Sequence, residues 1–255
     1  MHGELILSAA RWVNQWAARF FAEVDRAHHG PLMMKAAHTA EVANNAVVIA
    51  TGEALDERTA SLGLMAAWLH DCGRFPQYAE YRTFKDSESV NHGELGADII
   101  TEHRVLHGLD PHGRAAVLNA VRYHNTFGLP RLDDPLSMAV LRLVRDADKL
   151  DVWRVVADWY EAPPDEREGV VNYCVPEGGG FTPEVVDAFC RGEVVPLGMI
   201  RGQDDLKLLR LSWAFDLHHA TARAEALARG HLGRIAATLP PDERVEDALR
   251  RLIGV

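Results

Sequence analysis

The sequence predicts an all-α protein. Apolar residues recur at helical spacing along most of the chain, and glycine and proline fall between these stretches, where helices would end. We find no pair of alternating apolar and polar stretches that would form neighbouring strands. A length of 255 residues suffices for one large domain or two small ones. We therefore expect a single all-α domain over residues 1–255, with a C-terminal helical part from about 183 to 255.

Six helices are expected in the first two thirds of the chain. Pro31 suits a first turn, Gly73 and Pro76 stop a helix, and Ser87 can act as an N-cap. Asp-Pro pairs open the last two helices. The expected ranges are 4–27, 31–51, 56–71, 87–103, 110–125 and 134–159.

The remaining third begins with a stretch rich in glycine, proline and acidic residues, which predicts a loop between 162 and 183. A short helix at 183–191 and a longer one at 203–229 follow, and then short helices up to the C-terminus.

Charge and composition exclude several classes of function. Lys and Arg total 27 against 37 Asp and Glu, and the net charge of −10 argues against a nucleic-acid polymer or an anionic membrane as partner. No apolar stretch approaches the ~20 residues that span a bilayer, and we see no signal peptide. Cys72, Cys174 and Cys190 are too few and too widely spaced for a disulfide framework. We expect a cytoplasmic protein with reduced thiols.

The pair His70-Asp71 is the most informative feature of the chain. It ends the apolar helix LGLMAAWLHDC, and a buried carboxylate needs a partner or a metal. Asp148 shares a helix face with apolar residues, whereas Asp146 falls beside Arg142 on a face expected to be solvated. Four further side chains of ligand type lie on separate helices: His38, His92, His124 and Asp148.

Each of these residues alone has a plainer interpretation. A single histidine on an apolar face is more often a hydrogen-bonded core residue, and a single aspartate near a lysine is more often a surface pair. Five helical segments that each present such a group argue against coincidence. Imidazole and carboxylate together suit Fe, Mn, Co, Ni or Zn, so the sequence predicts a centre of divalent transition metals, two per chain, held between helices.

The stretches KAAHTAEVANNA, MAAWLHDCGRF, SVNHGELGADII, AVRYHN and VRDADKLDVW carry these residues in order. Over about 30–155 they resemble the HD-domain superfamily of metal-dependent phosphohydrolases. The resemblance implies a first metal on His38, His70, Asp71 and Asp148, and a second on Asp71, His92 and His124, with Asp71 as the bridge. The Gly-Tyr-Pro signature of the cyclic-dinucleotide phosphodiesterases is absent from the sequence, so cyclic di-GMP is not the expected substrate.

The expected function is therefore hydrolysis of a small phosphate ester or a nucleotide, in which metal charge activates a water molecule. Asp71 and Arg74 are the expected catalytic residues. Four cations are candidates for binding the phosphate, although each has a surface interpretation as well: Arg74, Arg82, Lys85 and Lys149.

Two other functions stay open on the sequence. The same six ligands resemble the mixed-valent diiron oxygenases of the superfamily. A non-catalytic, metal-dependent ligand-binding protein is the third possibility. Substrate identity and oligomeric state cannot be derived from the sequence.

Overall fold

The computed structural model describes residues 2–163, 165, 167, 169–171, 175–176 and 179–254. Throughout these residues the chain forms helices and short 3-10 turns and no strand, which confirms the all-α prediction. Its contacts divide it into two compact units, Met1–Asp151 and Val152–Val255. The expectation of one domain over the whole chain stays a prediction.

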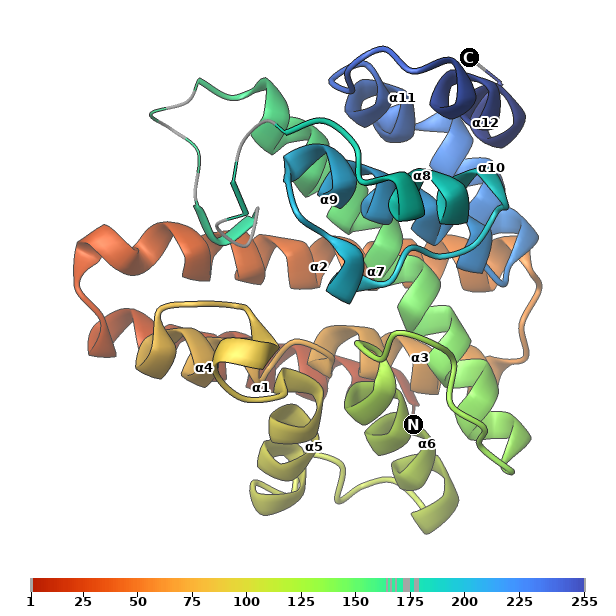
Figure 1. Cartoon of the computed structure of the whole chain (residues 1–255). Coiled ribbons are helices and arrows are strands. Elements are labelled where there is room, and N and C mark those ends of the chain that lie inside the picture. Colours follow the sequence, from red (N-terminus) through yellow and green to blue (C-terminus); the bar gives the residue numbers. More distant parts are fainter. Residues whose placement is uncertain are drawn as a thin grey trace. The chain divides into compact units, whose positions relative to one another are not determined.

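The first unit is built around α3. This helix packs against α1, α2 and α6, while α5 and α6 lie side by side (Figure 1). The apolar side of α3 is fully buried, with Leu62, Met65 and Leu69 at 1% exposure or less. The helices of the unit are α1 (His2–Glu23), α2 (His29–Gly52), α3 (Glu57–Leu69), α4 (Arg74–Tyr81), α5 (His92–Glu102), α6 (Pro111–Tyr123) and the first part of α7 (Pro135–Glu161).

Side-chain caps fix where α3, α5 and α6 begin. Asp56 accepts from the Thr59 amide at the start of α3, and Asp110 caps α6 in the same way. The predicted start of α5 at Ser87 is wrong. Ser87 lies in a 3-10 turn, and the cap is Asn91, whose side chain accepts from two backbone amides of the first turn.

Helix α4 falls where the sequence predicts only a break after α3. Pro76 is its third residue, and a proline in the first turn costs a helix no hydrogen bond. Gly73 forms the corner between α3 and α4. A Cβ atom there would lie 2.3 Å from the backbone oxygen of His92, so the corner can touch the start of α5 only as glycine.

The first part of α7 packs closely on its neighbours. A Cβ atom on Gly63 of α3 would lie 2.3 Å from Cδ2 of Leu143. Asn45 of α2 donates a 3.0 Å hydrogen bond to the backbone oxygen of Ala147. These contacts hold three of the expected ligand-bearing helices together.

The second unit contains the end of α7 and five shorter helices. The predicted helix at 203–229 is wrong, because α9 ends at Ser212 and a 3-10 turn over Trp213–Asp216 follows. The turn brings the ring of Phe215 to 5.6 Å from that of Phe189, measured between centroids. The helices are α8 (Pro183–Cys190), α9 (Gln203–Ser212), α10 (Ala220–Ala228), α11 (His231–Ala236) and α12 (Glu243–Ile253).

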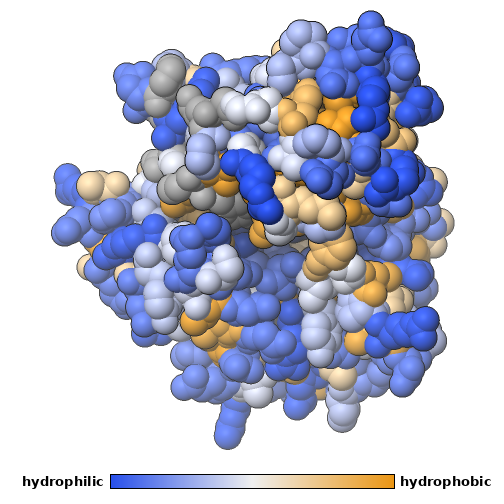
Figure 2. All heavy atoms as spheres, viewed as in Figure 1, coloured by the Kyte–Doolittle hydropathy of each residue, from blue (hydrophilic) through white to orange (hydrophobic). Residues whose placement is uncertain are grey.

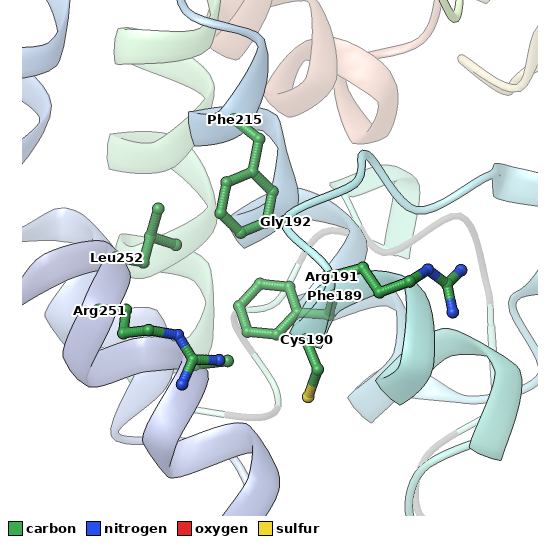
Figure 3. A pocket seen from close by; sticks show the side chains of 8 residues that line it. Phe189, Cys190, Arg191, Gly192, Phe215, Arg251 and Leu252 are labelled. Carbon is green, nitrogen blue, oxygen red and sulfur yellow. The ribbon is translucent and has the colours of Figure 1, made fainter.

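The second unit also holds a pocket of about 330 Å³. Its two phenyl rings lie in the middle, and the guanidinium groups of Arg191 and Arg251 point to either side (Figure 3). None of the expected metal ligands belongs to it. The lining residues are Phe189, Cys190, Arg191, Gly192, Phe215, Ala248, Arg251 and Leu252.

The face of the molecule drawn in Figure 2 is mainly hydrophilic, with small separate hydrophobic patches. Among the described residues, no helix combines the length and the apolar character needed to cross a membrane. Cys72 and Cys190 are free thiols, and Cys174 lies outside the described residues.

Candidate metal centre

Six side chains from five helical segments meet inside the first unit. His38 comes from α2, His92 is the first residue of α5, and Asp148 lies on α7. The other three follow helix ends, His70 and Asp71 after α3 and His124 after α6. Their donor atoms form three overlapping groups, each within 4.8 Å: His38, His70 and Asp71; His70, His124 and Asp148; Asp71, His92 and His124.

Asp71 stands at the centre of this cluster with one oxygen toward each half. Its Oδ2 lies 3.6 Å from Nε2 of His38 and 3.4 Å from Nε2 of His70. Its Oδ1 lies 3.4 Å from Nε2 of His92 and 3.7 Å from Nε2 of His124. A carboxylate in this position can bridge two cations.

Asp148 completes the first half. Its Oδ1 lies 3.1 Å from Nε2 of His38 and 3.9 Å from Nε2 of His70. Asp146, however, is completely buried, while the Asp148 side chain is 22% exposed. The solvated face predicted for Asp146 is therefore wrong. Asp148 is the candidate ligand because it lies close to the imidazoles of His38 and His70, and not because it is more buried than Asp146.

Two of the imidazoles are oriented by their own helix ends. Nδ1 of His70 lies 2.7 Å from the backbone oxygen of Ala67, and Nδ1 of His124 lies 2.7 Å from that of Val121. A carbonyl only accepts, so each Nδ1 carries the proton and each Nε2 turns a lone pair toward the cluster.

The other two imidazoles are oriented by carboxylates. Nδ1 of His38 lies 2.7 Å from Asp151, and Nδ1 of His92 lies 2.8 Å from Asp86. A carboxylate behind an imidazole fixes its tautomer and strengthens it as a metal ligand. Asp86 and Asp151 were not predicted. Asp151 follows Asp148 by one helical turn, a spacing that would have indicated it.

The Nε2 atoms fit a bound cation. Nε2 of His70 is buried without a hydrogen-bond partner. Nε2 of His92 and Nε2 of His124 lie only 2.9 Å apart, although both rings already donate from Nδ1. Two lone pairs that face each other in a buried site are unfavourable unless a cation lies against them. Four imidazoles and two carboxylates match the ligand preferences of divalent transition metals.

Protonation states in the cluster favour metal binding. Burial lowers the pKa of His92 to about 3, helped by the charge of Arg74, and burial also lowers the pKa of His124. Burial alone would raise the pKa of Asp71, but the charge of Lys35 holds it well below its usual range. Neutral imidazole and ionised carboxylate are the forms that bind metals.

His38 differs from the other imidazoles. Burial and Lys35 each lower its pKa, yet hydrogen bonds to Asp148 and Asp151 raise it above the ordinary value. Cys72 is no competing ligand, because burial and the charge of Asp71 raise the pKa of its thiol far above neutrality.

The cation closest to the centre was not predicted. Nζ of Lys35 lies 2.6 Å from Oδ2 of Asp71 and packs over the ring of Phe84 at 5.6 Å. Lys35 precedes His38 by three residues, so both occupy one face of α2. This spacing was the signal in the sequence that could have revealed it.

Arg74, expected to bind phosphate, is occupied within the protein. Its Nη1 donates to Gln77 at 2.9 Å, to the backbone oxygen of Phe84 and to Asp86 at 3.0 Å. Its Nε lies 3.5 Å from Oδ1 of Asp71. Arg74 thus reaches the cluster as a buried charge.

The remaining expected phosphate-binding residues make contacts elsewhere. Arg82 turns back on α4 and donates to the backbone oxygen of Ala79 at 2.6 Å. Lys85 pairs with Glu88 at 2.6 Å. Lys149 is buried directly after Asp148. Their contact with a substrate stays a prediction.

The family model of the HD domain matches residues 36–153. The matched segment contains all six candidate ligands together with Asp86 and Asp151. The search of curated proteins returned no match, and neither did the search of solved structures. The resemblance drawn from the sequence is thus confirmed. Residues 36–153 of the chain match the HD domain, which defines a superfamily composed mostly of metal-dependent phosphohydrolases.

Proposed function

We propose that this protein hydrolyses a small phosphate ester at a centre of two divalent transition metals. The first metal is assigned to His38, His70, Asp71 and Asp148, and the second to Asp71, His92 and His124. One observation carries the proposal: the two oxygens of Asp71 face separate pairs of imidazole nitrogens.

Bound metals would supply the charge that polarises a phosphoryl oxygen and lowers the pKa of a water molecule. The protein supplies the arrangement. Asp71 fixes the two halves at a short separation, and the acceptors behind Nδ1 hold all four imidazoles in one tautomer. Because these side chains are already in position, they need no rearrangement when negative charge develops on the phosphate.

Lys35 is our candidate for contact with the substrate phosphate. Its side chain is 14% exposed, and that of Asp148 is 22% exposed, while the His70 side chain is completely buried. Solvent and substrate therefore reach the cluster beside Lys35 and Asp148. An ammonium group at that point can pair with a phosphate oxygen through a charge-assisted hydrogen bond.

The test is metal content together with phosphate release. Protein purified without added metal or chelator is analysed for elements and assayed on p-nitrophenyl phosphate, bis-p-nitrophenyl phosphate and nucleotides, with and without oxygen. About two transition metals per chain and oxygen-independent phosphate release support the proposal. Asp98→Asn, which changes a carboxylate exposed on α5, is the matched control and keeps full activity.

Two other results would overturn the proposal. Two irons per chain with no phosphate release would favour an oxygenase. Bound metal without any turnover, after reconstitution with each candidate metal, would favour a non-catalytic binding protein.

A further inference from the structure

We propose that Asp86 sets the affinity of the second metal position, the one formed by Asp71, His92 and His124. Asp86 is a positioning residue, since it acts through His92 and Arg74. The inference rests on the two-metal centre proposed above. It adds that the two positions differ in strength and that one carboxylate outside the ligand set controls the weaker one.

Asp86 collects donors from three directions. Its carboxylate accepts from Nδ1 of His92 at 2.8 Å and from Nη1 of Arg74 at 3.0 Å. It also accepts from the side-chain amides of Gln77 at 2.8 Å and Asn125 at 2.9 Å. Because all four partners donate, both oxygens of the carboxylate are needed.

The second position is poor in negative charge. In the assignment proposed above, the first position has two carboxylates, Asp71 and Asp148, whose Oδ1 lies 3.1 Å from Nε2 of His38, and the second has only Asp71. The buried guanidinium of Arg74 also stands beside the second position, with Nε 3.5 Å from Oδ1 of Asp71. A cation at His92 and His124 is therefore repelled by Arg74, as one at the first position is by Lys35, 2.6 Å from Oδ2 of Asp71. The first position has Asp148 to offset this repulsion, and the attraction of a buried site for a metal is sensitive to each unit of charge.

Asp86 offsets both the low negative charge of the second position and the positive charge of Arg74. It neutralises Arg74 through their ion pair, and it stands directly behind the imidazole of His92. Removing its charge leaves His92 a weaker ligand and leaves Arg74 to pair with Asp71, the carboxylate that the metal also needs. Both effects weaken the second position.

The first position has an equivalent residue. Asp151 accepts from Nδ1 of His38 at 2.7 Å and is buried. Asp86 and Asp151 therefore form a matched pair, each behind one ligand of a different metal. If Asp86→Asn weakens the second position and Asp151→Asn weakens the first, each carboxylate acts locally and not through a general loss of stability.

The experiment is calorimetric titration of metal-free protein with Mn²⁺, with EPR spectra of the loaded forms. For Asp86→Asn we expect the first affinity to stay within about twofold and the second to fall about 10–100-fold. The spectrum of coupled Mn²⁺ ions should fade at stoichiometric loading. Asp151→Asn should weaken the first position instead.

A double variant keeps the test decisive if Asp86→Asn folds poorly. Asp86→Asn with Arg74→Gln removes both charges of the ion pair and leaves no guanidinium to pair with Asp71. Its second affinity should lie between those of the wild type and Asp86→Asn. Thermal unfolding of each metal-free variant shows which ones are folded.

Three results would overturn the inference: Asp86→Asn binding two metals as tightly as the wild type, an equal loss at both positions, or a wild type that takes only one metal. The readout is metal binding, so it is separate from the proposed reaction. The expected titrations without hydrolysis of any phosphate ester would overturn only the proposed function.

Discussion

Asp71 touches both halves of the cluster, so we expect its loss to remove both metals. Asp71→Asn should reduce metal content to near zero and abolish phosphate release. His124→Ala should lose mainly the second metal, because Nε2 of His124 lies beside Nε2 of His92 and on the Oδ1 side of Asp71. Elemental analysis after stringent purification measures both. Full metal content in both variants would contradict the two-metal arrangement.

Lys35→Met should lower kcat/KM on phosphate esters about 10–100-fold, the value of one charge-assisted hydrogen bond of about 1.5–3 kcal/mol. Metal content should stay unchanged, because Lys35 is no ligand. Lys85→Met is the comparison variant. Lys85 pairs with Glu88, so its loss should leave turnover intact, and a fall as large as that of Lys35→Met would support Lys85 as a phosphate-binding residue.

At the scale of residues, polar groups on apolar helices were enough to predict which six side chains come together. The residues around them were harder to foresee. Asp86 lies in a 3-10 turn between helices, where no periodicity assigns a direction to a side chain. From the sequence, Arg74 was predicted to bind phosphate. That its Nη1 already donates hydrogen bonds to Gln77 and Asp86 can be seen only in the folded structure.

Among the elements, the corner between α3 and α4 allows a sharp test. Gly73→Ala would place a Cβ atom 2.3 Å from the His92 backbone oxygen and 2.9 Å from the Gly96 amide nitrogen. Overpacking of this kind costs about 1–3 kcal/mol, and the shift of α5 should also weaken binding of the second metal. Urea unfolding and metal titration measure the two effects.

Gly233→Ala is the matched control for this substitution. Gly233 lies inside α11, and the Cβ atom of an alanine there would meet nothing within 4 Å beyond its chain neighbours and the backbone of its own helix, so the substitution should stabilise the helix by up to about 1 kcal/mol. If Gly73→Ala behaved like Gly233→Ala, the close approach of the corner to α5 would not matter for stability.

The helices with strong boundary signals were predicted well. Asp110-Pro111 and Asp134-Pro135 place α6 and α7 within two residues of their observed ends. Helix α4 was missed because a proline this close to Gly73 predicts a helix end, although Pro76 in fact lies in a first turn. The break after Ser212 was missed because the apolar period continues through Trp213 and Phe215, whose packing against Phe189 depends on the tertiary structure.

For the whole molecule, metal should act as a stabilising ligand. Free metal at 100 times its dissociation constant raises the free energy of unfolding by about 2.7 kcal/mol per site. The melting temperature should therefore rise on addition of Mn²⁺ and fall again with chelator. Asp71→Asn should show no such rise, and an equal rise in that variant would place the binding elsewhere.

Metal-free protein should lose stability in acid. The pKa of His92 is lowered from 6.5 to about 3, so folding favours the neutral ring. This stabilisation is complete above about pH 6.5 and is lost as the pH falls toward 3. His124 acts in the same direction, while His38, with a raised pKa, acts in the opposite one. Urea midpoints in chelator at pH 7.5 and pH 5 measure the net effect, and a higher midpoint at pH 5 would contradict it.

The position of the boundary between the two units was not predicted from the sequence. The boundary follows Asp151 and so falls inside the continuous helix α7. Glycine, proline or a change in composition usually marks a boundary in a sequence, and none occurs here. Because α7 is shared by both units, the division can be recognised only from the contacts in the folded structure.

The hydrogen bond from Lys35 to Asp71 bears on whether the chain folds before or after it binds metal. With every imidazole Nδ1 hydrogen-bonded to the protein and an ammonium group already against the central carboxylate, the chain has a counter-charge of its own before any metal arrives. Folding can then precede loading. If the centre binds metals as proposed, we expect supply at the time of loading to influence which metal is bound, and we expect a metal on the folded chain to be exchangeable for another.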